Sequence, residues 1–429
     1  MTVNLTSIIA DLESKIANAD ANSSLSDLLS LLNSAERLTG TKSIYDSSEL
    51  LTSAAEEGSV KFQNDGSLRF YNGTNWDLLN NPTHYTFQGT ISGYISGAGI
   101  GSSFSNVIEK FSFTSDGNGS DVGDLTVTRG GTAGQSSNTH GYNSGGANTD
   151  PTAKDEIDKF SFSVDGNATD VGNLSQARYL VTGQTSSTHG YSSGGYTKAY
   201  PGTRYDNIDK FTLSSDADAT DVGNLTLAGH TPAGASSSTH GYNAGRVEPA
   251  FSNVIDKFSF SVDGNATDVG DLTGALHGGA GNSSTTHGYS SGGRTGPSSN
   301  SNVIQKYPFA TDANATDVGD LTVTRAYVAG QSSTTHGYSS GGGLVPGTLQ
   351  NVIDKFTFSS DANATDVGDL TQARSYSSGT SSSSSGYAAG GFAPPQVNTI
   401  DKFPFSSDAN ATDVGDLLLS KTDTSGTQG

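Results

Sequence analysis

The sequence contains no cysteine in 429 residues, which excludes a disulfide framework, a zinc–thiolate site and thiol chemistry. Basic residues are scarce: 22 Lys and Arg stand against 43 Asp and Glu, so the net charge is −21. Because phosphate contacts need a basic surface, this balance disfavours binding to nucleic acid. No hydrophobic run approaches membrane-spanning length, and the first residues lack the basic start and apolar core of a signal peptide. We therefore expect neither a nucleic-acid partner nor insertion into a membrane.

A sequence repeat occupies most of the chain. The phrase Thr-His-Gly-Tyr-x-Ser-Gly-Gly, followed by Asn-Val-Ile-Asp-Lys-Phe, recurs at intervals of about 49 residues. Its Gly-Tyr pair occurs at Gly93-Tyr94, Gly141-Tyr142, Gly190-Tyr191, Gly241-Tyr242, Gly288-Tyr289, Gly337-Tyr338 and Gly386-Tyr387. A period of about 40–50 residues built from short strands is typical of propeller blades. The seven units therefore predict seven blades.

Each unit reads as four short strands, and the sixth unit illustrates the pattern. Its predicted strands span residues 325–332, 336–341, 351–358 and 366–371. The third of these alternates apolar and polar residues with period two, as expected for a half-buried strand. Clusters of Gly, Asn, Asp and Ser separate the strands, and no segment after about residue 80 has a helical period. The predicted fold class is mainly β.

The units resemble those of the kelch family of propellers. Glycine doublets occur where kelch units carry theirs, at Gly145-Gly146, Gly194-Gly195, Gly292-Gly293, Gly341-Gly342 and Gly390-Gly391. The Leu-Thr-x-x-Arg ending, as in Leu321–Arg325, is similar to the end of a kelch unit. The kelch Trp is missing from every unit, and the third unit has Gly245-Arg246 in place of the doublet. The resemblance covers roughly residues 90–426 and implies a seven-bladed kelch-like β-propeller over residues 83–429.

The C-terminal end of the repeat indicates how the ring closes. Residues 421–428 match residues 374–381, the first strand of a unit, but no further strand follows them. The first unit has the other three strands and only a poor match before Gly93. We therefore predict that the C-terminal strand completes the first blade and leaves no open sheet edge between the ends of the ring.

The first 57 residues are predicted to form a short α-helical segment. Leu5, Ile9, Leu12 and Ile16 step by four, three and four residues, which is the a/d seam of a coiled coil. This spacing favours docking or oligomerisation, and a homotrimer is the expectation by analogy with phage fibres. The alternative is a pair of amphipathic helices that pack on another protein.

Residues 58–82 are predicted to form a β-hairpin connector. The turn sequence Asn64-Asp65-Gly66 lies between two segments of alternating residues. The segment and its Tyr-Asn-Gly-Thr-x-Trp ending resemble a module of bacteriophage tail-fibre and other virion appendage proteins. This resemblance implies localisation in the virion, on a tail or capsid appendage, with other virion proteins as partners.

Two repeated polar features have both a structural and a chemical interpretation. The turns of the form Asp-x-Asn-x-Thr-Asp, such as residues 361–366, are expected to hydrogen-bond their own backbone, and calcium binding is the alternative. A second repeated residue is the His at His140, His189, His240, His287 and His336. Because the position is repeated, we expect each imidazole to hydrogen-bond a neighbouring blade rather than a ligand. No other metal or cofactor is expected.

Recognition is assigned to the loops that follow the glycine doublets, because these loops vary while their flanks are repeated. Aromatic and Arg side chains are the usual anchors of recognition sites. The candidate binding residues are Tyr196, Lys198, Tyr200, Arg204, Tyr205, Arg246 and Arg294. The opposing interpretation is that surface loops accumulate such residues without function. No Ser, His or Asp stands apart from the repeats as a catalytic group, so the chain is not expected to be an enzyme.

These features predict a bacteriophage virion structural protein, a tail fibre or similar appendage. Its N-terminus would attach to the particle, and its propeller would contact a glycan or protein of the host surface. Two alternatives stay open: a capsid or tail decoration protein without receptor binding, and a glycan depolymerase.

Overall fold

The computed structural model describes residues 89–429, apart from 151, 199–201, 248–249 and 345–346, together with four short strands before residue 82. The chain divides into two compact units, residues 1–82 and 83–429. In the first unit, β1 (Ile44–Tyr45), β2 (Val60–Phe62), β3 (Leu68–Tyr71) and β4 (Trp76–Leu78) form one sheet in this order. β2 and β3 are antiparallel neighbours, which is the pairing that the alternating sequence predicted. The candidate oligomerisation residues Leu5, Ile9, Leu12 and Ile16 lie outside the described residues.

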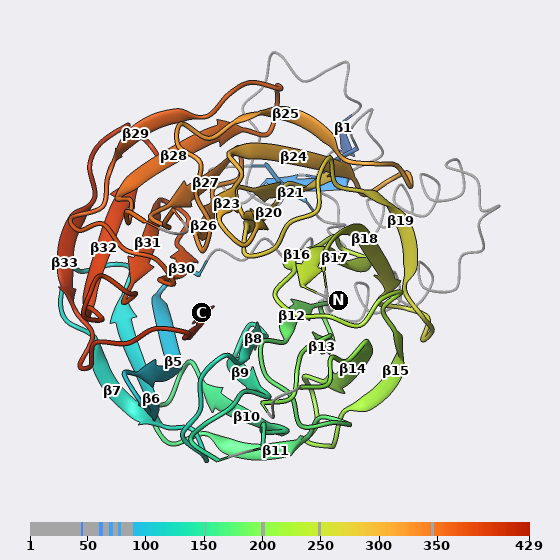
Figure 1. Cartoon of the computed structure of the whole chain (residues 1–429), viewed down its shortest axis with the longest axis vertical. Coiled ribbons are helices and arrows are strands. Elements are labelled where there is room, and N and C mark those ends of the chain that lie inside the picture. The colour runs from blue at the N-terminus through green and yellow to red at the C-terminus, as the bar shows by residue number, and fades with distance from the viewer. Residues whose placement is uncertain are drawn as a thin grey trace, which may run out of the picture. The chain divides into compact units, whose positions relative to one another are not determined.

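The second unit is a ring of seven four-stranded antiparallel sheets, so the prediction of a seven-bladed β-propeller is confirmed (Figure 1). We number the sheets as blades 1 to 7 and give their strands from the axis outward. Blade 1 consists of β34 (Ser425–Gln428), β5 (Ser92–Ile100), β6 (Ser103–Ser112) and β7 (Ser120–Asp124). Blade 2 consists of β8 (Ala133–Ser136), β9 (His140–Ser144), β10 (Glu156–Ser161) and β11 (Thr169–Asn173), and blade 3 of β12 (Thr182–Thr185), β13 (His189–Ser193), β14 (Asn207–Thr212) and β15 (Thr220–Asn224).

The remaining four blades repeat this order. Blade 4 consists of β16 (Ala233–Ser236), β17 (His240–Val247), β18 (Phe251–Ser259) and β19 (Thr267–Asp271), and blade 5 of β20 (Ala280–Ser283), β21 (His287–Ser291), β24 (Val303–Pro308) and β25 (Thr316–Asp320). Blade 6 consists of β26 (Ala329–Ser332), β27 (His336–Ser340), β28 (Val352–Thr357) and β29 (Thr365–Asp369), and blade 7 of β30 (Ser378–Ser381), β31 (Ser385–Ala389), β32 (Thr399–Pro404) and β33 (Thr412–Asp416). A small hairpin, β22 (Arg294–Gly296) with β23 (Ser299–Asn300), extends the loop of blade 5. The described residues contain no helix, and hence none there that is long and apolar enough to cross a membrane.

The ring closes as predicted, through the C-terminal strand. β34 pairs with β5, with Ser425 opposite Ser96 and Gln428 opposite Gly93. The backbone of Gly429 accepts a hydrogen bond from Thr90 at 3.0 Å and donates one to Ser92 at 3.1 Å. Blade 1 is therefore assembled from both ends of the propeller, which leaves no unpaired sheet edge between them.

Each interface between blades is built from a Tyr of one blade and two apolar residues of the next, both aromatic except between blades 2 and 3, where they are Phe211 and Leu213. Between blades 3 and 4, the centroid of the Tyr191 ring lies 5.5 Å from that of Phe258 and 4.8 Å from that of Phe260. Tyr191 also donates a hydrogen bond from its hydroxyl to the carbonyl oxygen of Phe260 at 3.1 Å. The Phe258 ring covers Gly241, where a Cβ would come within 2.3 Å of a ring carbon, so this repeated position needs glycine. The repeated Tyr and Phe thus form the core, as predicted.

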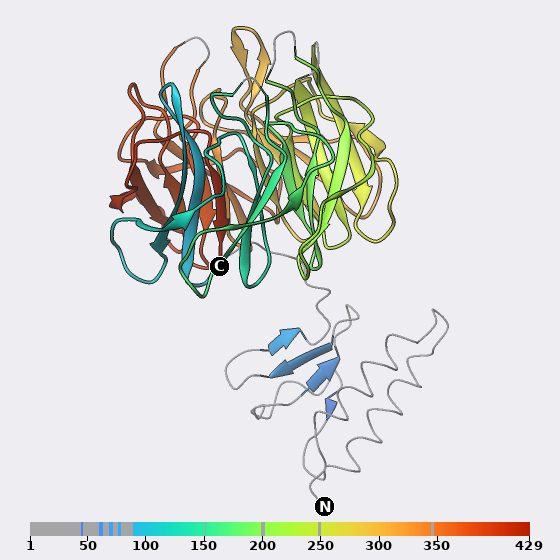
Figure 2. The same ribbon diagram turned by 90° about the horizontal axis from the view of Figure 1, so that it is seen from below.

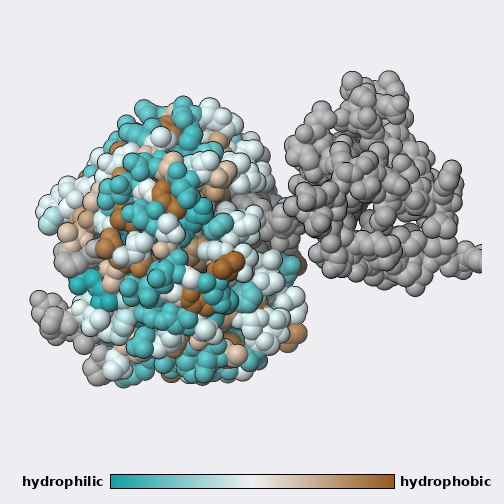
Figure 3. All heavy atoms as spheres, turned by 90° about the vertical axis from the view of Figure 1, so that its right-hand side faces the viewer, coloured by the Kyte–Doolittle hydropathy of each residue, from teal (hydrophilic) through white to brown (hydrophobic). Residues whose placement is uncertain are grey.

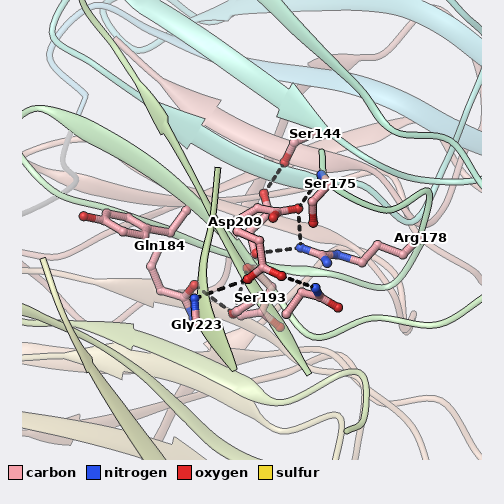
Figure 4. Close-up of polar contacts among 12 residues, drawn as sticks. Ser144, Ser175, Arg178, Gln184, Ser193, Asp209 and Gly223 are labelled. Atoms are coloured by element: carbon pink, nitrogen blue, oxygen red, sulfur yellow. Dashed lines mark hydrogen bonds and ion pairs between the residues drawn. The ribbon is translucent and has the colours of Figure 1, made fainter. Parts of the chain in front are cut away.

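A buried ion pair ties the segment before the first strand of most blades to the third strand. In blade 3, Arg178 Nη2 lies 2.9 Å from Asp209 Oδ2, and both side chains are fully buried (Figure 4). The backbone N–H of Ser175 donates to the same carboxylate oxygen at 2.9 Å. The equivalent pairs are Arg129–Asp158, Arg325–Asp354, Arg374–Asp401 and, in blade 1, Lys421–Glu109. Because an unpaired buried charge is strongly destabilising, each partner requires the other.

Blade 4 keeps this ion pair by another route, which corrects the prediction for Arg246. Gly229 stands at the position of the Arg, and Arg246 reaches the site from the glycine doublet, with Nη2 2.6 Å from Asp256 Oδ2. A Cβ on Gly229 would lie 2.8 Å from Arg246 Cδ, so both positions cannot carry long side chains. Arg246 is fully buried and therefore cannot anchor a partner at the surface. Blade 5 has no charge at the site, because Leu276 and Gln305 replace the pair.

Polar residues of the Asp-x-Asn turns join neighbouring blades at the outer edge of the ring. Lys257 Nζ pairs with Asp312 Oδ1 at 2.7 Å, and Asn314 Oδ1 accepts a hydrogen bond from the backbone N–H of Asp271 at 3.1 Å. The Lys–Asp pair recurs at every interface, and Lys402 with Asp116 closes the circle. Among the described residues, no group of three or more His, Asp or Glu is placed to hold a metal ion. The Asp and Asn side chains of these turns thus have partners in the adjoining blade.

The repeated His residues bond a different partner from the one predicted. His140 Nδ1 lies 2.8 Å from Thr139 Oγ1, and the same contact recurs at each of the other four positions. The backbone N–H of Ser137 donates to the His140 carbonyl oxygen at 2.8 Å and closes the turn. Each imidazole therefore caps the turn between the first two strands of its own blade, and the prediction of a bond to the neighbouring blade was wrong.

Candidate functional site at the axial mouth

One end of the propeller axis opens into a cavity of about 590 Å³, which we call the axial mouth. It lies where the first strand of each blade begins, beside the loops that follow the glycine doublets. The described residues that line it are Phe104, Gly130, Gly131, Ala147, Tyr179, Leu180, Lys198, His230, Thr231, His277, Tyr327, Tyr376, Phe392, Thr422 and Asp423. Every blade from 1 to 7 contributes at least one of them. A concave site with convergent aromatic and polar groups is the usual form of a ligand site.

The mouth is built from one backbone turn per blade. The second residue after the buried Arg position has a left-handed backbone in all seven blades, with φ between 52° and 65°. These residues are Asp423, Gly131, Leu180, Thr231, Gly278, Tyr327 and Tyr376, in blade order. The left-handed region favours glycine, yet five of the seven are other residues. In blade 6 this turn at Tyr327 explains why β26 begins at Ala329 rather than at the predicted residue 325.

A belt of backbone hydrogen bonds accounts for the left-handed conformation. The N–H of Tyr327 donates to the Gly278 carbonyl oxygen at 2.7 Å, and that of Tyr376 donates to Tyr327 at 3.2 Å. Equivalent bonds join Leu180 to Gly131, Gly131 to Asp423 and Gly278 to Thr231. The turn thus directs these five N–H groups sideways to the preceding blade instead of into their own sheet. The belt fixes the backbone and leaves the side chain at each position free to differ.

Aromatic side chains form a continuous arc around the mouth from blade 3 to blade 7. Tyr196 lies 5.6 Å from Tyr179 and 5.3 Å from His230, and His277 lies 5.9 Å from Tyr327, all measured between ring centroids. Tyr327 and Tyr376 are stacked, with centroids 4.3 Å apart. We call this series of rings the aromatic arc. Tyr376 is 41% exposed, so a face of the arc is open to a ligand.

Two histidines occupy the middle of the arc. Thr231 Oγ1 lies 3.4 Å from His230 Nδ1 and 3.3 Å from His277 Nδ1, so one hydroxyl bridges the two rings. Burial lowers the pKa of His230 to about 4, with a smaller contribution from the charge of Arg204. Burial also lowers the pKa of His277 to about 4, assisted by Arg294 and by His230. Both imidazoles are therefore neutral at physiological pH and can donate and accept hydrogen bonds.

The opposite side of the mouth carries a carboxyl group. Asp423 projects from the turn of blade 1, and burial raises the pKa of its carboxyl above the ordinary value. It is the only acidic residue among the described residues that line the cavity. The mouth therefore has an aromatic, histidine-containing side and a carboxyl side, with no internal symmetry.

The predicted recognition residues lie at this same end of the propeller. Lys198 lines the mouth, Tyr196 belongs to the aromatic arc, and the guanidinium of Arg204 lies 5.6 Å from the Tyr196 ring centroid. Arg294 Nη1 donates to the Tyr327 hydroxyl at 3.1 Å. Tyr205 is partly buried in the same loop, and Tyr200 lies outside the described residues.

Sequence reasoning missed the residues at the start of the first strands, above all Tyr179, His230, His277, Tyr327 and Tyr376. The signal was present in the repeat. The two positions after the Leu-Thr-x-x-Arg ending read Gly-Gly, Tyr-Leu, His-Thr, His-Gly, Ala-Tyr, Ser-Tyr and Thr-Asp around the ring. The pair is different in every unit although the strands of the unit are repeated, and the same contrast singled out the loops.

Outside the mouth, the large apolar side chains that the described residues expose are scattered. The exposed large apolar residues outside the mouth include Val164, Val262 and Leu418, which belong to different blades. Figure 3 shows the outer wall as a mixture of hydrophilic and weakly polar areas with small, separated hydrophobic ones. Scattered apolar residues of this kind are normal on a protein surface.

No protein-family model matches the sequence, and no curated protein matches it. Among solved structures, the chain is similar to that of YjhT, with a TM-score of 0.55 and 12% sequence identity. The match covers 67% of this chain and 98% of the YjhT chain. A likeness at this identity concerns the fold and leaves function to the site. The chain therefore shares its fold with YjhT.

Proposed function

We propose that this chain is a recognition subunit of a virion appendage, and that its propeller binds a host-surface glycan in the axial mouth. One observation carries the proposal: the pair of residues that precedes each first strand at the mouth is different in every blade, whereas the strands of the blades are repeated. A scaffold of nearly identical blades has no preferred side, so specificity must come from the positions that vary. The virion setting is supported by the resemblance of residues 58–76 to phage appendage modules.

The chemistry of the aromatic arc suits a sugar. Tyr and His rings present apolar faces for stacking and polar edges for hydrogen bonds. The stacked pair Tyr327 and Tyr376 supplies the largest exposed ring surface, and Thr231 with the two neutral histidines supplies donors and acceptors. Such a combination binds a hydroxyl-rich ring without requiring a net charge.

The path of the chain also supports recognition at the mouth. Gly89 pairs with Ser382, and Gly429 bonds Thr90, both at the ends of first strands that are remote from the mouth. Figure 2 shows the C-terminus at the edge of the propeller opposite the long hairpin loops. A smaller cavity of about 260 Å³ lies on the axis at this end and is lined mainly by repeated Gly, Ser and Gln residues. The polypeptide thus enters the propeller away from the loops that surround the mouth.

Binding of the protein to a panel of purified bacterial surface polysaccharides tests the proposal. The double variant Tyr327→Ala/Tyr376→Ala should bind at least about tenfold more weakly, since anchor residues contribute about 1–2 kcal/mol each or more. Val164→Ala/Val262→Ala, which removes exposed apolar groups far from the mouth, is the matched control and should bind as the parent does. Equal binding by both variants would refute a site at the mouth. Absence of binding to cells and polysaccharides would favour a decoration subunit, and release of reducing sugar would indicate a depolymerase.

A further inference from the structure

The charges around the mouth differ from those of the rest of the propeller. Seventeen Lys and Arg residues lie in residues 83–429, and fourteen of them form ion pairs with Asp or Glu. Within the part of the chain that the structure describes, the three without a carboxylate partner are Lys198, Arg204 and Arg294. Lys198 lines the mouth, and Arg204 and Arg294 contact Tyr196 and Tyr327 of the aromatic arc. The protein has a net charge of −21. If these three cations served only solubility, we would not expect them to lie close to one site.

Arg204 and Arg294 stand at the two ends of one continuous series of contacts. The Arg204 guanidinium lies over Tyr196, which contacts His230, and Thr231 connects His230 to His277. At the other end, His277 contacts Tyr327, whose hydroxyl accepts a hydrogen bond from Arg294. The series therefore contains two cations, two imidazoles and the hydroxyls of Tyr196, Thr231 and Tyr327.

Both arginines also have unused hydrogen-bonding capacity. Arg204 Nε and Arg294 Nε are buried donors without an acceptor. Buried donors normally have partners, and the cost of leaving one unpaired is about 1–3 kcal/mol or more for a charged group. Lys198 differs, because its ammonium donates to the carbonyl oxygens of Asn148 and Asp150. Unpaired Nε donors also occur in Arg129, Arg178, Arg246, Arg325 and Arg374, so the feature that distinguishes Arg204 and Arg294 among the described arginines is the lack of a carboxylate partner.

We infer that the glycan bound at the mouth is acidic, and that its carboxylate or sulfate groups lie along the arc between Arg204 and Arg294. This inference rests on the proposed function and names the class of glycan. A charged repeating polymer suits the site, because the two cations belong to different blades, Arg204 to blade 3 and Arg294 to blade 5. Oxyanions are the acceptors that a guanidinium binds most strongly. The carboxyl of Asp423, the one acidic lining residue among those described, belongs to blade 1 and not to blades 3 to 6, which form this series.

Titration of the full-length protein with sodium glucuronate, sodium sulfate and glucose tests the inference at constant ionic strength. The probe is the NMR signal of the His230 and His277 imidazoles, assigned by single His→Gln variants. Glucuronate and sulfate should shift both signals saturably, and glucose should bind at least about tenfold more weakly than glucuronate. Arg204→Gln/Arg294→Gln should weaken the response to glucuronate about tenfold or more, with an unchanged melting temperature as evidence of folding. Lys257→Gln removes a cation from the outer edge and should leave the titration unchanged.

Two outcomes would overturn the inference: equal responses to glucose and glucuronate, or no response of either imidazole to the anions. The two proposals fail in distinguishable ways. If polysaccharide binding survives in Arg204→Gln/Arg294→Gln but is lost in Tyr327→Ala/Tyr376→Ala, the mouth binds a neutral glycan and only the present inference is wrong. If no polysaccharide binds while the imidazoles still respond to glucuronate, the mouth is an anion site and the proposed host-glycan function is wrong.

Discussion

A β-branched residue in the left-handed region, such as Thr231 with a φ of 55°, is held there by its surroundings. Its carbonyl oxygen accepts the belt hydrogen bond from Gly278, and its hydroxyl bridges two histidines. The belt itself needs only the backbone, and glycine serves at the equivalent position of blades 2 and 5. The side chain at this position is therefore best explained by the ligand site rather than by the fold.

The backbone strain at Thr231 predicts an inverted order of stability between two variants. At an ordinary position Ala is more stable than Gly by about 0.5–1 kcal/mol. In the left-handed region the order reverses, so Thr231→Gly should exceed Thr231→Ala by about 1 kcal/mol in the free energy of unfolding. Denaturant titration of both variants measures the difference. If Ala proves the more stable of the two, the left-handed conformation is not strained.

The two histidines predict a loss of stability in mild acid. The folded-state pKa of His230 and His277 is lowered to about 4 by burial, whereas an unfolded His titrates near 6.5. The unfolded chain therefore binds more protons between these values, and stability that is fully present above pH 6.5 is lost as the pH falls towards 4. Thermal melting from pH 7 to pH 4 should show a steeper decline for the parent than for His230→Gln/His277→Gln. Parallel declines would mean that the imidazoles are not held neutral.

At the scale of single elements, the closing strand β34 carries more of the structure than its length suggests. It pairs with β5, and the segment before it supplies Lys421, the buried partner of Glu109. Deleting residues 421–429 should therefore lower the melting temperature far more than an ordinary terminal deletion of this length. The deletion opens the ring and leaves the buried carboxylate of Glu109 without its cation. Thermal melting of the shortened chain checks this. An unchanged melting temperature would exclude β34 as the closing strand.

The ion pair of blade 1 can be tested separately by replacing it with the uncharged residues that blade 5 has at the same positions. Lys421→Leu leaves Glu109 buried without a cation and should destabilise the protein by about 3–5 kcal/mol. Adding Glu109→Gln reproduces the Leu276 and Gln305 combination of blade 5 and should restore most of that loss. Denaturant unfolding of the single and double variants measures the coupling. A double variant that is less stable than Lys421→Leu alone would contradict the equivalence of the two blades.

For the whole molecule, the N-terminal unit is predicted to determine the assembly state. The a/d spacing of Leu5, Ile9, Leu12 and Ile16 favours self-association, with a trimer as the expected state. Light scattering of the full chain should then give an oligomer, and removal of residues 1–82 should give a monomer. An oligomer that persists after this removal would indicate that the propeller forms the contact between subunits.

The repeat predicted the propeller, the strand pattern and the closing strand, because periodic burial leaves a periodic sequence. It did not predict that Arg246 is buried in an ion pair. A single Arg in place of a doublet glycine looks like a surface cation until the structure places Gly229 and Asp256 beside it. It identified the end of the propeller that carries the candidate site but not its centre. Tyr327 and Tyr376 lie 49 residues apart in the sequence and meet only when two blades are side by side. Contacts between blades thus remain invisible to reasoning within one repeat.

The pairing of Gly429 with Ser92 and Thr90 also means that the order of blades along the gene is arbitrary. Since the two ends of the propeller meet, a circularly permuted chain that joins residue 429 to residue 89 and opens in the turn between β22 and β23 would contain the same blades and the same mouth. Such a permutant would place its new termini beside the aromatic arc instead of at the opposite end. A carrier protein fused there would obstruct the mouth.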